Sequence, residues 1–196
     1  MVREYLIKFS TVFNIFDLTD GELVMAKLQQ DDQRVSHGVN LLISILVRYP
    51  EIGTINFDAH NSTIKLTFML SSIPDAPEFN KLRTLLLNSI AAYHILEGSN
   101  PVTSDVELSS CEQVAMLTIL RDVATLSKGE IALLIVLLRD NLKDRLIADE
   151  NDAMLEEDLL VQEELIGNML ENIKTQQTGS GLIGIREDGR VLVFNK

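Results

Sequence analysis

Hydrophobic and polar positions alternate most regularly in the segment from Thr54 to Leu70. In its second half, every second residue is apolar: Ile64, Leu66, Phe68 and Leu70. Because successive side chains of a strand point to opposite faces of a sheet, this period predicts a strand with one buried face. Residues 54–58 alternate in the same way, with Ile55 and Phe57 as the apolar positions. Residues 58–62 between them are rich in turn-forming types, so the segment predicts a β-hairpin.

A second alternating segment covers residues 3–16, where Tyr5, Ile7 and Phe9 share one face. This pattern predicts a long first strand. From about residue 22 to residue 49 the apolar positions recur near every 3.6 residues, which predicts helix. Two adjacent aspartates at 31–32 interrupt the apolar stripe, so we expect two helices there, with Asp31 capping the second. Pro50 ends the helical pattern.

Two further helices are predicted from signals at their ends. The Pro-Asp-Ala-Pro sequence at 74–77 opens one helix, and Gly98 ends it. Ser127 and Glu130 have the spacing of a capping box, in which each side chain bonds the other residue's free backbone N–H, so a helix should begin at Lys128. Between these helices, residues 113–123 predict a strand, although their nearly continuous apolar run also fits a helix.

The segment 153–174 predicts a helix with a heptad-spaced face, which we call the seam. The seam residues are Leu155, Leu159, Gln162, Ile166, Met169 and Ile173. Their spacings alternate between four and three residues, as in helices that pack against a partner helix.

After a short linker, residues 182–187 and 190–195 flank an Asp-Gly pair, which predicts a tight β-hairpin. We call it the ribbon. A two-stranded ribbon alone is marginal in water, so it should dock on another element.

Over residues 1–125 the predicted order is strand, helix, strand, strand, helix, strand. This order is the βαββαβ pattern of ferredoxin-like domains, an antiparallel sheet with two helices on one face. We therefore predict an α+β chain in three parts: a ferredoxin-like domain (1–125), an acidic helical hairpin (126–177), and a linker with the ribbon (178–196). A helix at 106–123 would remove the fourth strand and leave a helical domain with a small sheet.

Charge narrows the classes of function. The chain has 196 residues, is 46% hydrophobic, and carries a formal net charge of −12. A surface with this charge argues against binding nucleic acid through its phosphates and against docking on an anionic membrane. The single cysteine, Cys111, excludes an intrachain disulfide, and no apolar run reaches the roughly 20 residues of a membrane span. We expect a cytoplasmic protein.

Two groups of residues are candidates for chemistry. Asp58, His60 and Asn61 lie together in the predicted hairpin loop, where an imidazole beside a carboxylate could act as a base. A solvated turn explains the same residues. Residues 149–173 contain nine acidic residues and no lysine or arginine. Carboxylates at helical spacing can bind divalent metals, but a solvated outer face or a surface for a basic protein explains this stretch more simply.

No nucleotide-binding, hydrolase or metal-binding motif occurs in the sequence. We therefore expect a non-catalytic interaction or regulatory module that forms a homo-oligomer and needs no cofactor. Its association would use the seam, the ribbon or the open face of the sheet. The alternatives are a sensor domain that binds a small metabolite and a metal-dependent enzyme that uses the acidic helix 149–173.

Overall fold

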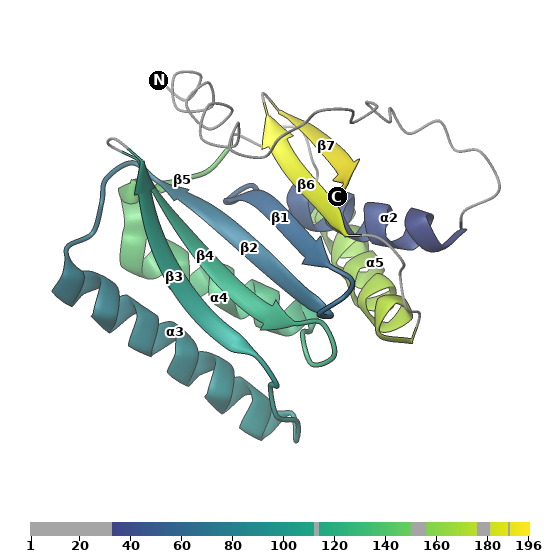
Figure 1. The fold of residues 1–196 in the computed structure, drawn as a ribbon, viewed down its shortest axis with the longest axis horizontal. Coiled ribbons are helices and arrows are strands. Elements are labelled where there is room, and N and C mark those ends of the chain that lie inside the picture. The colour runs from purple at the N-terminus through teal and green to yellow at the C-terminus, as the bar shows by residue number, and fades with distance from the viewer. Residues whose placement is uncertain (1–32, 112–113, 150–155, 176–180, 188) are drawn as a thin grey trace.

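The fold is α+β: in the part of the chain that the structure describes, helices pack against a seven-stranded antiparallel sheet (Figure 1). A computed structural model describes residues 33–111, 114–149, 156–175, 181–187 and 189–196. The predicted strand 3–16 and the predicted cap Asp31 lie outside these ranges. The strands are β1 (Ile52–Asp58), β2 (Thr63–Leu70), β3 (Ser104–Cys111), β4 (Val114–Asp122), β5 (Leu146–Ile147), β6 (Leu182–Glu187) and β7 (Arg190–Asn195). The helices are α2 (Gln33–Arg48), α3 (Ala76–Leu96), α4 (Lys128–Leu142) and α5 (Glu156–Thr175).

The predicted hairpin is β1 and β2, and it lies in the middle of the sheet. The strand order is β3-β4-β2-β1-β6-β7, with the short β5 also paired to β2. Ile55 lies opposite Leu66 and Phe57 lies opposite Ile64. All four side chains are buried in the core. The alternation in the sequence therefore predicted the correct buried face.

The sequence of residues 106–123 was compatible with either strand or helix. In the structure this segment belongs to a second hairpin, formed by β3 and β4. Leu117 and Ile119 of β4 are buried, and they alternate with the half-buried Met116, Thr118 and Leu120. The run is nearly continuous because the face of β4 away from the core is also largely apolar. The described strands do not establish a ferredoxin-like topology. Two strands, β3 and β4, follow α3 where the prediction had one, and the predicted first strand lies outside the described residues.

The described helices cover one face of the sheet. In Figure 1, α2, α4 and α5 lie behind the strands, and α3 runs along the β3 side. One buried cluster contains residues from Leu41 to Leu182, so it spans the boundaries predicted at 125/126 and 177/178. Within the described ranges, no helix is long and apolar enough to cross a membrane.

Both predicted helix starts have a side-chain cap, of which Ser127 was predicted and Asp75 was not. Asp75 precedes α3, and its carboxylate accepts the N–H of Glu78 at 2.8 Å. Ser127 precedes α4, and its hydroxyl accepts the N–H of Glu130 at 3.2 Å. A side-chain oxygen at this position satisfies one of the free N–H groups of the first turn. Glu130 does not complete the capping box, because its carboxylate bonds Arg121 and His94 instead.

The described residues of the seam pack against other elements of the same chain. Ile166 and Ile173 belong to the buried core, and Met169 packs against it. Helix α5 packs mainly against α2 of the same chain. Gln162 is half-buried, Leu155 is outside the described residues, and the side chain of Leu159 is not described. The described part of the seam is therefore occupied by intramolecular packing.

The ribbon has the predicted bounds and docks on the sheet. β6 pairs with β1 and β7 pairs with β6 in antiparallel registers. Gly189 in the turn has φ +73°, a conformation that glycine adopts without strain. At Gly184 a Cβ atom would lie 2.9 Å from Leu46 and 3.3 Å from Leu42 of α2. Glycine at this position lets the ribbon approach the helix closely.

Candidate functional site

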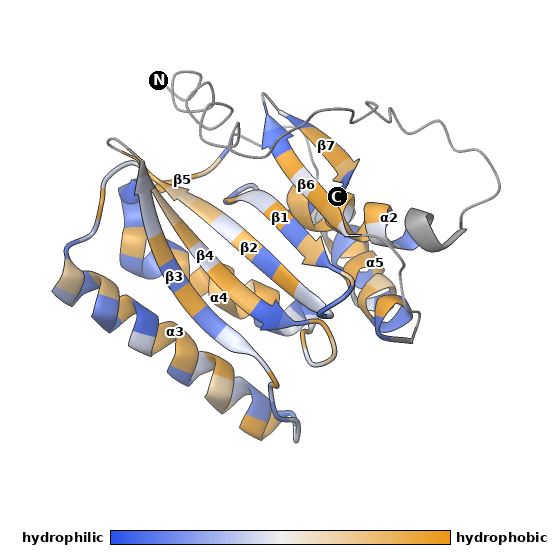
Figure 2. Cartoon of the chain, in the orientation of Figure 1, coloured by the Kyte–Doolittle hydropathy of each residue, from blue (hydrophilic) through white to orange (hydrophobic). Residues whose placement is uncertain are grey.

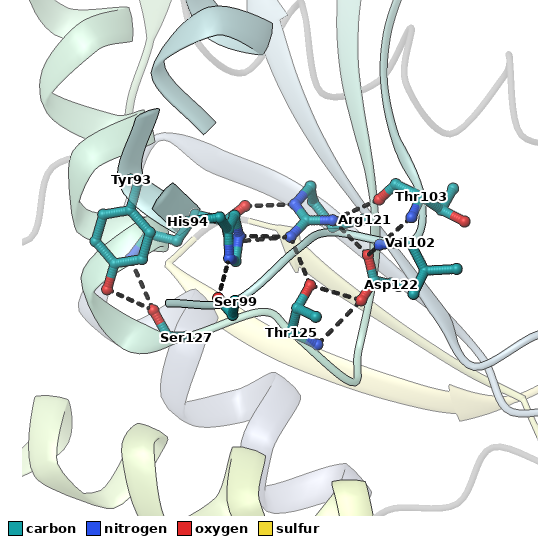
Figure 3. A network of polar contacts seen from close by, with 10 residues as sticks. Tyr93, His94, Ser99, Val102, Thr103, Arg121, Asp122, Thr125 and Ser127 are labelled. Carbon is teal, nitrogen blue, oxygen red and sulfur yellow. Dashed lines mark hydrogen bonds and ion pairs between the residues drawn. The ribbon is translucent and has the colours of Figure 1, made fainter. Parts of the chain in front are cut away.

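The most unusual polar group in the described fold is the side chain of Arg121, which is completely buried (Figure 3). Arg121 continues the row of Leu117 and Ile119 on the helix-covered face of β4. It lies between the end of α3 and the start of α4. Its neighbours His94 from α3 and Glu130 from α4 are also buried. We call Arg121, Glu130, His94, Asp122 and Thr125 the Arg121 cluster.

All five N–H donors of Arg121 have acceptors. Nε donates to Glu130 Oε1, and Nη1 donates to the carbonyl oxygen of Thr103 and to Asp122 Oδ1, the latter at 2.7 Å. Nη2 donates to Thr125 Oγ1 at 3.0 Å and to Glu130 Oε2 at 3.1 Å. The pair with Glu130 is therefore bidentate, the geometry in which guanidinium and carboxylate bind most strongly.

The donor count assigns the tautomer of His94. Its Nε2 lies 2.8 Å from Glu130 Oε2 and 3.0 Å from Arg121 Nη2. Both protons of Nη2 already have acceptors, so Nε2 carries a proton and donates it to Glu130. The other ring nitrogen, Nδ1, lies 2.7 Å from the hydroxyl of Ser99. His94 thereby fixes the loop after α3 to the start of α4.

Asp122 is held as a carboxylate by many donors. Oδ1 accepts the N–H groups of Val102 and Thr103 at 3.0 and 2.9 Å, and Oδ2 accepts the N–H and hydroxyl of Thr125 at 3.0 and 2.6 Å. Burial alone would raise the pKa of Asp122. The bonds from Thr103, Thr125 and Arg121 outweigh burial and hold this pKa far below its usual range.

The geometry of the Arg121 cluster suits a structural role, in which it links elements of the fold, better than a catalytic one. Arg121, Glu130 and His94 are nearly inaccessible to solvent, so a substrate could not touch them in this conformation. Their hydrogen bonds join β4, the C-terminus of α3, the N-terminus of α4 and the loop at 99–103. At the border of the cluster, the hydroxyl of Tyr93 lies 2.8 Å from Ser127 Oγ. A charge network satisfied in this way fixes one arrangement of its elements.

A second polar cluster surrounds Tyr49 at the end of α2. Arg48 lies over the Tyr49 ring, 5.0 Å from its centroid, and also reaches Glu163 of α5 at 3.4 Å. Glu51 pairs with Arg139 of α4. Burial, with a smaller contribution from Glu163, raises the pKa of the Tyr49 hydroxyl to about 12. This cluster joins α2, α4 and α5 on the helix-covered side of the sheet.

The candidate residues of the hairpin loop form a turn. Asp58 accepts the backbone N–H of Asn61 at 3.1 Å and its side-chain amide at 2.9 Å. These bonds lower the pKa of Asp58, the Asn61 side chain having the largest effect. His60 and Asn61 are exposed, and His60 adds only a backbone contact to Asp58. The structure brings the three residues together with the hydrogen bonds of a solvated turn.

Several carboxylates of the acidic stretch have cationic partners. Glu163 pairs with Arg48, Asp149 with Arg186 and Glu171 with Lys174. Among the residues that the structure describes, no group of three histidine, cysteine or acidic side chains could hold a metal ion. The predicted surface for a basic partner stays a prediction.

Sequence reasoning missed the Arg121 cluster. The available signal was a charged residue at an apolar position of the strand predicted at 113–123. Its partners come from other elements, so their meeting depends on the tertiary fold. No protein-family model, curated protein or solved structure matches this chain.

Proposed function

We propose that the chain is a non-catalytic interaction module that self-associates through β7, the strand at one edge of the sheet that the structure describes. One observation carries the proposal. β7 contains the four consecutive apolar residues 191–194, without a charge or a proline among them (Figure 2). An exposed apolar edge strand pairs readily with another strand unless something protects it.

The hydrogen-bonding groups of β7 alternate in direction. Lys196 donates its N–H to the carbonyl of Gly181 at 2.8 Å, and the β6–β7 register continues from that pair. In an antiparallel ladder every second residue bonds its neighbour, so residues 190, 192 and 194 bond β6. The N–H and C=O groups of Val191, Val193 and Asn195 then point away from β6, toward the open edge.

The edge formed by β3 at the opposite end of the strand order is protected. There the N–H of Val106 donates to the Asp105 carboxylate at 2.8 Å, and the Val106 carbonyl accepts from Arg83 of α3 at 3.0 Å. Asp105 and Glu107 also place charge on that strand, which discourages pairing with another chain. The two ends of the described sheet therefore differ, and β7 is the one suited to strand addition.

The test is the solution mass of the full chain, measured by light scattering on a sizing column over a range of concentrations. We expect twice the mass of one chain, unchanged by magnesium. Val193→Pro removes an N–H that points outward while keeping the bonds to β6, so it should yield monomer. The matched control is Ser110→Pro, which removes an outward N–H from β3 and should leave the dimer intact.

A wild-type monomer at all concentrations would overturn the proposal. A mass that changes only when magnesium is added would instead favour the metal-dependent alternative. Circular dichroism of both proline variants checks that the β content is retained. A dimer that survives Val193→Pro in a folded protein would show that β7 is not the contact.

A further inference from the structure

Within the described sheet the outer edge of β7 is unpaired, and this edge is self-complementary. If two copies pair antiparallel around a two-fold axis, a residue on the axis faces itself in the second copy. Side chains that face each other across such a pair must lie on the same side of the sheet, so the axis passes through a residue and not between two residues. Axes at Leu192 and at Val193 are the two that keep most of residues 191–194 paired.

Charge distinguishes these two registers. An axis at Val193 places Arg190 opposite Lys196 of the second copy, and like charges directly opposite each other destabilise a sheet. An axis at Leu192 places Arg190 opposite Phe194 of the second copy, a contact between a cation and an aromatic ring that is favourable. It also pairs Val191 with Val193, and Leu192 with itself.

The charge of the ribbon also favours contact between two copies of this acidic chain. Residues 181–196 contain three basic and two acidic residues, whereas the whole chain has a net charge of −12. The acidic surplus therefore lies outside the ribbon. Leu192 is 36% exposed on the sheet face away from the helices, which leaves its side chain available to a second copy.

We propose that two copies of this chain join their sheets through antiparallel β7 strands, with Leu192 on the two-fold axis. This inference rests on the self-association proposed above and adds its partner and register. The joined sheet would have the helices of both copies on the same side, because a two-fold axis perpendicular to a sheet preserves its faces.

A charge exchange at Leu192 tests the register. Leu192→Lys and Leu192→Glu each place like charges face to face, so each variant alone should raise the dimer dissociation constant about tenfold or more. An equimolar mixture should recover dimer, because lysine then faces glutamate. Ile73→Lys and Ile73→Glu are the controls, since Ile73 is 48% exposed in the loop between β2 and α3, and β1 and β6 separate β2 from β7 in the sheet. These controls should not change the mass.

The outcomes separate the two proposals. If the wild type is dimeric and both Leu192 variants remain dimeric, the register is wrong and self-association stands. If both variants dissociate and their mixture does not recover, Leu192 touches the interface without facing itself, and the register is again wrong. A monomeric wild type overturns both proposals. Melting curves of the four variants establish that each is folded.

Discussion

Glu130 is the residue whose replacement tests whether the Arg121 cluster stabilises the fold. Glu130→Gln keeps the size of the side chain but removes the charge that the buried Arg121 and the donor His94 both face. Removing one partner of a buried ion pair leaves the other charge uncompensated, so the free energy of unfolding should fall by about 3 to 5 kcal/mol. Urea unfolding measures this loss. Glu164→Gln, on the exposed surface of α5, is the matched control and should leave stability unchanged.

Asp122 should make stability depend on acid pH. Its folded-state pKa lies below the ordinary value of an aspartate, about 3.9, so the folded chain binds this proton more weakly than the unfolded chain does. The resulting stability is fully present near neutral pH and is lost as the pH falls below about 5 toward the folded pKa. Asp122→Asn should therefore be roughly 2 to 3 kcal/mol less stable near neutral pH.

The difference between wild type and Asp122→Asn should shrink as the pH falls, because the wild-type carboxylate is then protonated. Unfolding titrations at a series of pH values measure this difference. A difference that stays constant down to strong acid would show that packing, and not the charge of Asp122, is responsible.

Among the elements, α5 offers a direct comparison of two neighbouring residues. Ile166 of the seam is 0% exposed, whereas Leu165 beside it is 39% exposed. Ile166→Ala removes buried methyl groups and leaves a cavity, so we expect a loss of about 2 to 5 kcal/mol in unfolding free energy. Leu165→Ala should cost less than about 0.5 kcal/mol. Equal losses in chemical denaturation would mean that α5 presents a different face to α2.

Elements specified by local sequence were predicted well. The 54–70 hairpin and the ribbon were correct because alternation and turn residues are local signals, and the predicted cap Ser127 acts within one turn. Strand β4 matches the strand predicted at 113–123, but β3 was missed, because Val106 and Leu108 are too few apolar positions to show a clear two-residue period. The seam was predicted to take part in association between chains, and its described residues Ile166, Met169 and Ile173 pack within the chain. Its partner, α2, is distant in sequence and could not be read from the heptad spacing.

At the scale of the whole molecule, the arrangement of elements and the polar clusters could not be predicted. In the strand order, β6 lies beside β1, so the chain must come back to the sheet after α5. No local sequence pattern predicts this long-range pairing. The Arg121 cluster likewise needs α3, β4 and α4 to meet. The sequence showed only that Arg121 interrupts an apolar strand. Residues that depend on such meetings become visible only in the folded chain.

The net charge of −12 leads to a prediction about the assembled molecule. Two acidic copies repel each other, and a contact built from backbone hydrogen bonds and apolar side chains contains few ion pairs for salt to weaken. Raising ionic strength from about 0.01 M to about 1 M shortens the screening length from about 30 Å to about 3 Å. The dimer dissociation constant, measured by sedimentation, should therefore fall as salt is added. Sodium and potassium chloride should act alike, since screening does not depend on the cation. Dissociation by salt would instead show that ion pairs hold the copies together, which the proposed β7 contact does not allow.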